Sequence, residues 1–272
     1  DVTRHWTGKG QGLLGVIDVD GVSYRFMGKE VSTEETPVRF EKAAIQRSVN
    51  VLPTQTYYTF ECGPICLDLI FTSPLLLDDL DRMSTPVNYI SWQVHATDGK
   101  AHETRLTVEA SPSLAVHSDD QAVTVAFEEE NGISYLKAGT VEQPVLVRKG
   151  DDVRIDWGYF YLAARTKKQT EMKVNDRQQL VFSHDMKTMS GSPQSGFLMV
   201  GYDDLYSIQY FKDNRMGYWK HNGKKNIRQA FEGSAEEYRS VMDRCRHFDT
   251  RLMEDAEKAG GKEYAELCAV AY

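Results

Sequence analysis

Short apolar-rich runs separated by clusters of turn residues fill positions 11 to about 212. The segment GVIDVDGVSYRFMG predicts a β-hairpin, because Asp20 and Gly21 suit the two positive-φ positions of a type I′ turn. YYTFECGPICLDLIF repeats the design around Gly63-Pro64, and YISWQVHATDGKAHE repeats it around Asp98-Gly99. Further strands are predicted over 122–127, 133–138, 144–148, 153–163, 179–184, 197–201 and 206–211. This series of hairpins predicts a mainly β fold, a large antiparallel β-sandwich.

The pattern changes after about Tyr218. The polar, basic stretch KHNGKKNIRQAFEG is typical of a linker, and Ser234 then precedes Glu237 by the capping-box spacing. Apolar residues follow at helical spacing for about 24 residues, namely Tyr238, Val241, Met242, Cys245, Phe248, Leu252 and Ala256. Gly260-Gly261 predicts the end of this helix, and a second helix is expected from Lys262.

These patterns predict three parts in the chain. Residues 1–220 form the sandwich, residues 221–233 form a linker, and residues 234–272 begin a helical domain that is cut off inside its second helix. The short C-terminal helical segment therefore carries an apolar side whose intended neighbours we expect to be missing from this chain.

Composition excludes several classes of partner. With 40 acidic and 32 basic residues the net charge is −8, which argues against a nucleic-acid backbone or an anionic membrane surface as the main partner. No apolar run reaches the length of a membrane span. The segment after Asp1 has no signal-peptide core. Four scattered cysteines are too few for a disulfide framework.

Sequence motifs do not indicate an active site. Gly10-x-Gly12-x-x-Gly15 matches the dinucleotide fingerprint by letter, but a strand and a hairpin are expected where that fingerprint needs a helix. The nucleophile elbow Gly-x-Ser-x-Gly, the zinc motif His-Glu-x-x-His and the phosphate loop do not occur. We therefore assign no catalytic residue, no cofactor and no metal.

One acidic group and one aromatic group are candidates for contact between domains. Asp78, Asp79 and Asp81 crowd into four positions that lack the spacing of a calcium loop, so a solvated loop is favoured over a site that faces a neighbouring domain. Trp157 and Tyr159 lie in a dense aromatic strand, for which burial or a domain interface is favoured over a carbohydrate platform. Phe248 and Leu252, on the apolar side of the long helix, complete the candidate interface.

The predicted hairpin register also places two pairs of histidine and cysteine side chains. A two-residue turn at Asp98-Gly99 places His95 opposite His102, and this is interpreted as a structural pair because zinc needs a third protein ligand. Cys62 and Cys66 flank the Gly63-Pro64 turn on a diagonal, which is poor geometry for a disulfide. They are interpreted as small apolar fillers.

Several stretches together resemble the glutaminase A family of fungal and bacterial proteins. They are HWTGKGQGLLGVIDVDGVSYRFMG, YTFECGPICLDLIFTSPLLLDDLDRMSTPVNYISWQVHATDGKAHE, IDWGYFYLA and RHFDTRLMEDAEKAGGKEYAELCAVAY. The resemblance implies that a β-sandwich precedes a helical domain of the six-hairpin (α/α toroid) kind. It also implies hydrolysis of the small molecule L-glutamine to L-glutamate and ammonia, and a secreted or periplasmic parent protein. No catalytic residue is carried over, because the matched stretches belong to the sandwich and the first helices.

The resulting hypothesis is a non-catalytic sandwich portion of a glutaminase-like amidohydrolase. Its expected partner is the helical domain of the same polypeptide, and this chain alone is expected to be inactive. The alternative is the sandwich region of a glycoside hydrolase or a carbohydrate-binding protein, and a third hypothesis is a plain interaction module.

Overall fold

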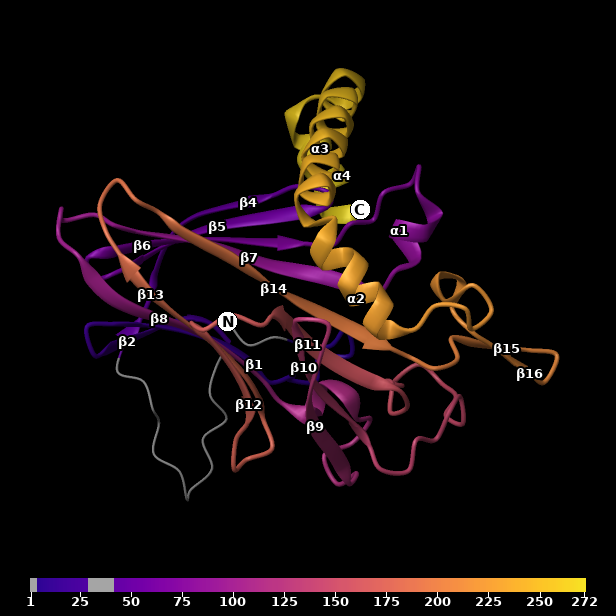
Figure 1. Ribbon diagram of the computed structural model, residues 1–272. Coiled ribbons are helices and arrows are strands. Elements are labelled where there is room, and N and C mark those ends of the chain that lie inside the picture. Colours follow the sequence, from indigo (N-terminus) through magenta and orange to yellow (C-terminus); the bar gives the residue numbers. More distant parts are fainter. Residues whose placement is uncertain (1–3, 29–41) are drawn as a thin grey trace.

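The computed structural model describes residues 4–28 and 42–272, and they form two large β-sheets that pack face to face with helices at one side (Figure 1). The smaller sheet has six strands in the order β12 (Thr170–Val174), β13 (Leu180–Thr188), β8 (His102–Ala110), β1 (Leu13–Val19), β2 (Val22–Met27) and β3 (Lys42–Ala43). The larger has eight, in the order β4 (Ile45–Val51), β5 (Gln55–Cys62), β6 (Ile65–Thr72), β7 (Val87–Ala96), β14 (Gln194–Asp203), β11 (Tyr159–Arg165), β10 (Ile133–Thr140) and β9 (Val123–Glu130). The predicted mainly β sandwich with a short C-terminal helical segment is confirmed.

The main core lies between the two sheets. Strand alternation sends every second side chain into it, so that Ile65, Leu67 and Leu69 of β6 are buried while Cys66 and Asp68 face outward. Buried residues from both sheets complete this cluster, among them Ile17, Val94, Leu106, Val108, Leu136, Leu162, Phe182 and Leu198. The apolar periodicity of the sequence thus matches burial in the sandwich.

Helices cover part of the outer face of the eight-stranded sheet. They are α2 (Ile227–Glu236), α3 (Tyr238–Gly260) and α4 (Lys262–Ala271). Figure 1 shows α2 lying across β7 and β14, while α3 and α4 run on together beyond the sandwich. The shorter elements are α1 (Leu80–Ser84), the 3₁₀ turns η1 (Pro112–Ala115) and η2 (Tyr218–Lys220), and the hairpin β15 (Ile208–Tyr210)–β16 (Asp213–Arg215). None of the helices in the described ranges is long and apolar enough to cross a membrane.

Two of the three predicted hairpins are confirmed. Asp20 and Gly21 have φ values of 48° and 84° and join β1 to β2, as a type I′ turn requires. β5 pairs with β6 around Gly63-Pro64, where Cys62 lies opposite Ile65 and not opposite Cys66. All four cysteines are unbonded, and burial raises the pKa of Cys62 to about 12, as expected of an apolar filler.

The third predicted hairpin, around Asp98-Gly99, is wrong. β7 and β8 belong to different sheets, so the bend between them carries the chain across the sandwich and does not fold it back. His95 therefore lies opposite Cys66 of β6, while His102 lies opposite Thr188 of β13. The Asp-Gly signal fixes a sharp turn, but which sheet accepts the next strand depends on long-range burial.

Strand prediction also failed in the segment 141–158. Residues 144–148 form no strand and contain a turn at 145–146, because Pro144 has no amide hydrogen for a ladder and Leu146 takes φ 56°. Strand β11 begins at Tyr159, whereas a strand was predicted from position 153. β12, with its alternating half-buried and exposed residues, was missed.

The helical segment begins earlier than predicted. The capping box is formed by Asn226 and Gln229, each backbone amide donating to the other's side chain at 3.0 Å, so residues 227–233 of the predicted linker are helical. Ser234 lies buried inside α2, and Glu237 lies at the break between α2 and α3. The second break is as predicted, since Gly261 has φ 83° and Lys262 opens α4.

Candidate functional site

A second apolar cluster lies between the outer face of the eight-stranded sheet and the helices. Its members include Tyr89, Tyr135, Tyr161 and Met199 from strands and Phe231, Val241, Met242 and Cys245 from α2 and α3. The Phe231 ring is fully buried, with its centroid 5.8 Å from those of both Tyr135 and Tyr161. Burying such a ring is worth about 1.5–3 kcal/mol. α2 and the first half of α3 therefore pack tightly on the outer face of the eight-stranded sheet.

Two tyrosines fix the break between α2 and α3 on the sheet. The Tyr238 ring stacks on Phe197 with centroids 3.8 Å apart, and its hydroxyl donates to Ser91 Oγ at 2.8 Å. The Tyr89 hydroxyl donates to the carbonyl oxygen of Ser234 at 3.0 Å. Each ring makes apolar contacts, and its hydroxyl group is hydrogen-bonded. The two tyrosines together therefore fix the direction in which α3 leaves the sheet.

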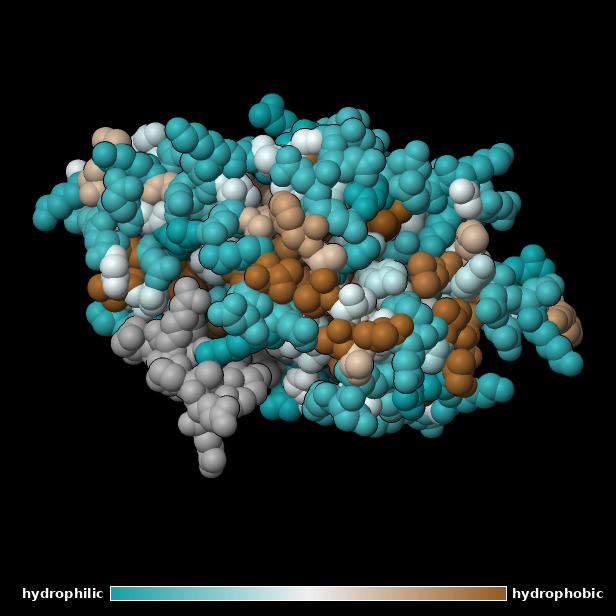
Figure 2. Space-filling model, turned by 60° about the horizontal axis from the view of Figure 1, so that its bottom comes forward, coloured by the Kyte–Doolittle hydropathy of each residue, from teal (hydrophilic) through white to brown (hydrophobic). Residues whose placement is uncertain are grey.

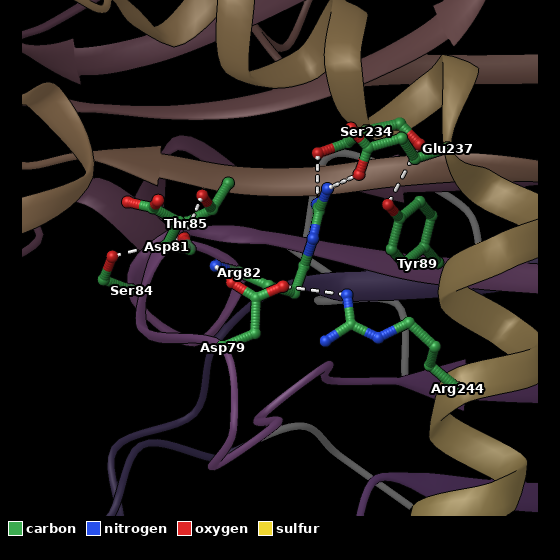
Figure 3. Close-up of polar contacts among 9 residues, drawn as sticks. All are labelled: Asp79, Asp81, Arg82, Ser84, Thr85, Tyr89, Ser234, Glu237 and Arg244. Carbon is green, nitrogen blue, oxygen red and sulfur yellow. Dashed lines mark hydrogen bonds and ion pairs between the residues drawn. The ribbon is translucent and has the colours of Figure 1, made fainter.

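A network of ion pairs joins the break between α2 and α3 to the short helix α1, which precedes β7 (Figure 3). The Arg82 guanidinium, with a side chain only 10% exposed, donates to Ser234 Oγ at 3.1 Å and pairs with Glu237. Asp79 caps α1 by accepting from the Arg82 amide at 2.9 Å, and its second oxygen accepts from Arg244 at 2.8 Å. The pKa of Asp79 is lowered, first by the amide of Arg82 and then by the hydrogen bond from Arg244.

The predicted acidic group thus contacts the helical segment. Besides the Asp79 pair, Asp78 lies 3.6 Å from Arg244, and Asp81 lies 3.1 Å from His221 beside η2. The structure places Asp78 and Asp79 between the sandwich and α3, where both contact Arg244, whereas Asp81 lies beside η2, before the C-terminal helices. The three carboxylates therefore do not share one partner.

Asp249 is a buried charged residue at this site that the sequence reasoning missed. It lies on α3, is 1% exposed, and accepts from the amide and the hydroxyl of Thr54, both at 2.8 Å, while its other oxygen has no hydrogen-bond partner. Burial raises the pKa of this carboxyl, and the Thr54 hydrogen bonds offset only part of that effect. An Asp within an otherwise apolar helical side was the signal that could have identified it.

Beyond Asp249, α3 and α4 leave an open apolar groove of about 780 Å³. It is lined by Phe248, Arg251, Leu252, Asp255, Ala256, Ala259, Tyr264, Cys268, Ala271 and Tyr272. Tyr264, Leu267 and Val270 of α4 are 47%, 63% and 72% exposed. The apolar side of the helical segment is therefore half covered: the sheet covers the first half of α3, and the groove stays open to solvent.

The candidate aromatic residues of segment 157–161 do not line this groove. Trp157 donates its indole hydrogen to the carbonyl oxygen of Tyr206 at 3.1 Å, and Lys137 lies 5.2 Å above the ring of Tyr159. Phe160 faces the core between the sheets, and Tyr161 faces the helices. Phe248 and Leu252 do line the groove. Of the predicted interface residues, these two lie together, whereas Trp157 lies apart.

The β6–β7 pairing brings together one group of chemistry-bearing side chains, Cys66, Asp68 and His95. Burial raises the pKa of the Cys66 thiol, and the carboxylates of Asp68 and Glu61 raise it further. A thiolate nucleophile needs the opposite shift. This group is therefore not arranged for nucleophilic attack on an amide.

Comparison with known proteins places the sequence in a family. A domain of unknown function, DUF5127, matches residues 54–181 and 164–255. Glutaminase A of Aspergillus oryzae is 22% identical over 97% of this chain and 42% of its own length, so this chain spans less than half of that relative. A solved structure named "Putative kojibiose phosphorylase from human microbiome" aligns at 9% identity and a TM-score of 0.48, over 89% of this chain and 28% of that one.

Proposed function

We propose, from the premise that this chain belongs to the DUF5127 family, that it is the sandwich portion of a glutaminase-like amidohydrolase. In this proposal the parent protein converts L-glutamine and water to L-glutamate and ammonia, and a helical domain of the same polypeptide carries the catalytic groups. The similarity to Glutaminase A along 97% of the chain supports the reaction class.

The observation that carries the proposal is the open groove between α3 and α4. Monomeric proteins rarely leave a continuous apolar surface of this kind without an interaction that covers it. α3 and α4 form an antiparallel pair joined at Gly261, and such a pair stacks naturally against further helical hairpins. We propose that residues 234–272 begin the helical domain and that its next hairpin occupies the groove.

The charges around the groove indicate the kind of partner surface. Arg251 and Asp255 lie on its rim, while Phe248, Leu252 and Ala256 form its floor. The matching surface would be an apolar helix edge flanked by an acidic and a basic residue. The ion pairs of Asp79, Arg82 and Arg244 then hold the first hairpin at a fixed angle for the rest of the domain.

An activity comparison tests the reaction class and the location of the chemistry. Ammonia release from L-glutamine is measured for this chain alone and for the longer polypeptide that continues into the helical domain. We expect turnover by the longer protein and none by this chain. Ammonia released by this chain would overturn the supporting role, and inactivity of a folded longer protein on glutamine would overturn the glutaminase assignment.

Variants in the groove lining test the groove as the docking surface. Ala259→Arg with Ala271→Arg should leave the melting temperature of this chain nearly unchanged, because both side chains line the groove and are exposed. In the longer protein the same pair should lower the melting temperature and the activity. Glu254→Arg, an exposed position of α3 outside the groove lining, is the matched control. Equal behaviour of the control and the double variant in the longer protein would argue against docking here.

The carbohydrate-binding alternative depends on an exposed row of aromatic rings. On the face shown in Figure 2, outside the grey atoms, apolar side chains gather in patches separated by hydrophilic ones. The exposed rings of Tyr210 and Phe211 lie in the β15–β16 hairpin, but their planes are 74° apart and form no flat platform. Binding to a glycan array that is lost in Phe211→Ala would favour this alternative.

The compartment belongs to the same proposal. We propose a secreted or periplasmic parent protein, on the strength of the similarity to Glutaminase A. Fractionation of the native host with an antibody against this chain tests it. Recovery in the medium or periplasm supports export, and recovery in the cytosol overturns it.

A further inference from the structure

Strands β6 and β7 bring three metal-ligand side chains together on the outer face of the eight-stranded sheet. Cys66 and His95 are direct cross-strand partners, and Asp68 follows Cys66 by two residues on the same face. The cysteine sulfur, a carboxylate oxygen and a ring nitrogen all lie within 4.8 Å of one another. All three residues are partly buried, so the cluster is reachable from solvent without being fully exposed.

Strand alternation explains why these three side chains meet. Ile65, Leu67 and Leu69 point into the sandwich core and fix the orientation of β6. Cys66 and Asp68 must then face outward, and the antiparallel register sets His95 beside them. On β7, His95 follows Ser91 by four residues, which is roughly 13 Å along the strand. Ser91 is the residue that accepts the hydrogen bond from Tyr238 of α3.

We propose that Cys66, Asp68 and His95 bind a divalent cation of the Zn²⁺ type, with solvent at the fourth position. Thiolate, imidazole and carboxylate are the ligand types that Zn²⁺ takes in proteins, and three protein ligands with one open position are typical of reactive zinc sites. Tetrahedral bonding places ligand atoms about 3.5 Å apart. Small side-chain rotations on a rigid sheet bring the three atoms to that spacing.

The surroundings favour a cation at this point. Thr59 donates its hydroxyl to one oxygen of Asp68 at 2.7 Å, which orients the carboxylate as outer-shell partners of metal ligands do. Glu61 lies opposite Cys66 on β5 and adds negative charge, part of which Arg47 balances. Cys62, the other cysteine of this hairpin, is fully buried in the core and cannot contribute a ligand.

This inference is independent of the glutaminase proposal, because it concerns residues of the sandwich that no step of the proposed reaction uses. Tag-free protein is stripped with a chelator, incubated with Zn²⁺, freed of excess metal by gel filtration and assayed for bound zinc. We expect stoichiometric zinc and a higher melting temperature, since a ligand that binds the folded state stabilises it. With Co²⁺ in place of Zn²⁺ we expect a thiolate-to-cobalt charge-transfer band.

Single variants assign the ligands. Cys66→Ser should abolish the charge-transfer band, and His95→Asn and Asp68→Asn should each weaken zinc binding by at least tenfold, about the loss typical of disturbing a metal's supporting shell. Thr59→Val should weaken it by about tenfold while the band remains. Far-ultraviolet circular dichroism of each variant checks that the sheet is intact, and His95→Asn provides a test that does not depend on the cysteine.

Matched controls use the same residue types on the helical segment. Cys268→Ser on α4 and His247→Asn on α3 replace a half-buried cysteine and an exposed histidine far from the sheet cluster. Both variants should bind zinc as the wild type does. Substoichiometric zinc in the wild type would overturn the proposal, and so would binding that persists in Cys66→Ser and His95→Asn or that is lost in the controls.

Discussion

At the residue scale, two titratable side chains with raised pKa values lie at junctions of the fold. Asp249 joins α3 to the start of β5, and burial raises its pKa. His102 joins the β1–β2 turn to the bend between the two sheets, bonded to Asp20 at 2.6 Å and Asp98 at 3.0 Å, and these hydrogen bonds raise its pKa. The negative charge of the buried Asp249 carboxylate destabilises the folded state, whereas the positive charge of protonated His102 stabilises it.

For Asp249 we expect the stability of the folded state to fall as pH rises. The folded pKa lies above the ordinary value of 3.8, so the folded chain holds a proton that the unfolded chain releases, and stability declines from that value up to the raised pKa. Asp249→Asn keeps an acceptor for Thr54 and should raise the melting temperature at neutral pH more than at low pH. Asp249→Ala leaves the Thr54 amide unpaired and should cost about 1–3 kcal/mol.

Thermal unfolding of the wild type and both variants from about pH 3 to pH 8 measures this difference. A gap between Asp249→Asn and the wild type that does not change with pH would contradict the raised pKa. Because all other groups are shared, their titration cancels in the comparison.

For His102 we expect the stability of the folded state to fall with rising pH as well, but in a higher pH range, and here the charged form is the stabilising one. A histidine whose folded pKa is raised stabilises the protein below its unfolded pKa, and this contribution is lost as pH rises through the folded pKa. His102→Asn should therefore lower the melting temperature more at about pH 5 than at about pH 9. His247→Asn, an exposed position on α3, serves as the control and should show little change at either pH. An equal loss at both pH values would show that His102 acts through packing and not through charge.

At the element scale, the arrangement of α2, α3 and α4 depends on the two breaks between them, at Glu237 and at Gly261. Gly261, between α3 and α4, has φ 83° and ψ −179°, a region open essentially to glycine alone. A Cβ atom built there meets nothing within 4 Å, so the cost of a side chain would come from the backbone alone. The break before α3 instead depends on the Arg82 network.

Gly261→Ala should destabilise the protein or fray α4 by about 1–3 kcal/mol, because alanine is strained at these angles. Gly233→Ala is the matched control, since Gly233 lies inside α2 with open space at its Cβ position. It should stabilise the protein by about 0.5–1 kcal/mol through helix propensity. Urea unfolding followed by circular dichroism measures both values, and a neutral Gly261→Ala would contradict the conformational argument.

Arg82→Met tests the first break. Methionine keeps the packed stem but removes the contacts to Ser234 and Glu237, and we expect a loss of about 1–3 kcal/mol in the free energy of unfolding. Arg246→Met is the control, because the Arg246–Asp243 pair is exposed within α3 and should contribute less than about 1 kcal/mol. Losses of similar size in the two variants would mean that the buried network adds nothing beyond a surface ion pair.

Prediction from sequence succeeded where an element is decided locally and failed where it depends on distant partners. The Asp20-Gly21 hairpin and the Gly261 break follow from backbone angles that few residues allow. The Asp98-Gly99 bend has the same letters as a hairpin, yet the chain there crosses between sheets. The sequence also did not predict that Cys66 lies opposite His95. A long loop joins β6 to β7, and such a loop does not fix the register of the two strands as a tight turn does.

At the scale of the whole molecule, stability should decline from the sandwich toward the end of α4. The sheets share a continuous core, whereas α4 buries only Ala265 and Ala269 among its side chains and packs mainly on α3. Amides of weakly packed elements exchange through local opening. The junction at Asp249 and Thr54 is where the change in stability should occur.

Hydrogen exchange followed by mass spectrometry measures that gradient. We expect fast exchange in α4 and in α3 beyond Asp249, and slow exchange in β6, β7 and β14, because opening the far helices exposes little buried apolar area. In the longer polypeptide, the same helical peptides should become protected if a further hairpin fills the groove, whereas the protection of the central strands should stay unchanged. Exchange in α4 as slow as in β7 for this chain alone would contradict the view of the groove as an uncovered surface, since the helices would then already be stably packed.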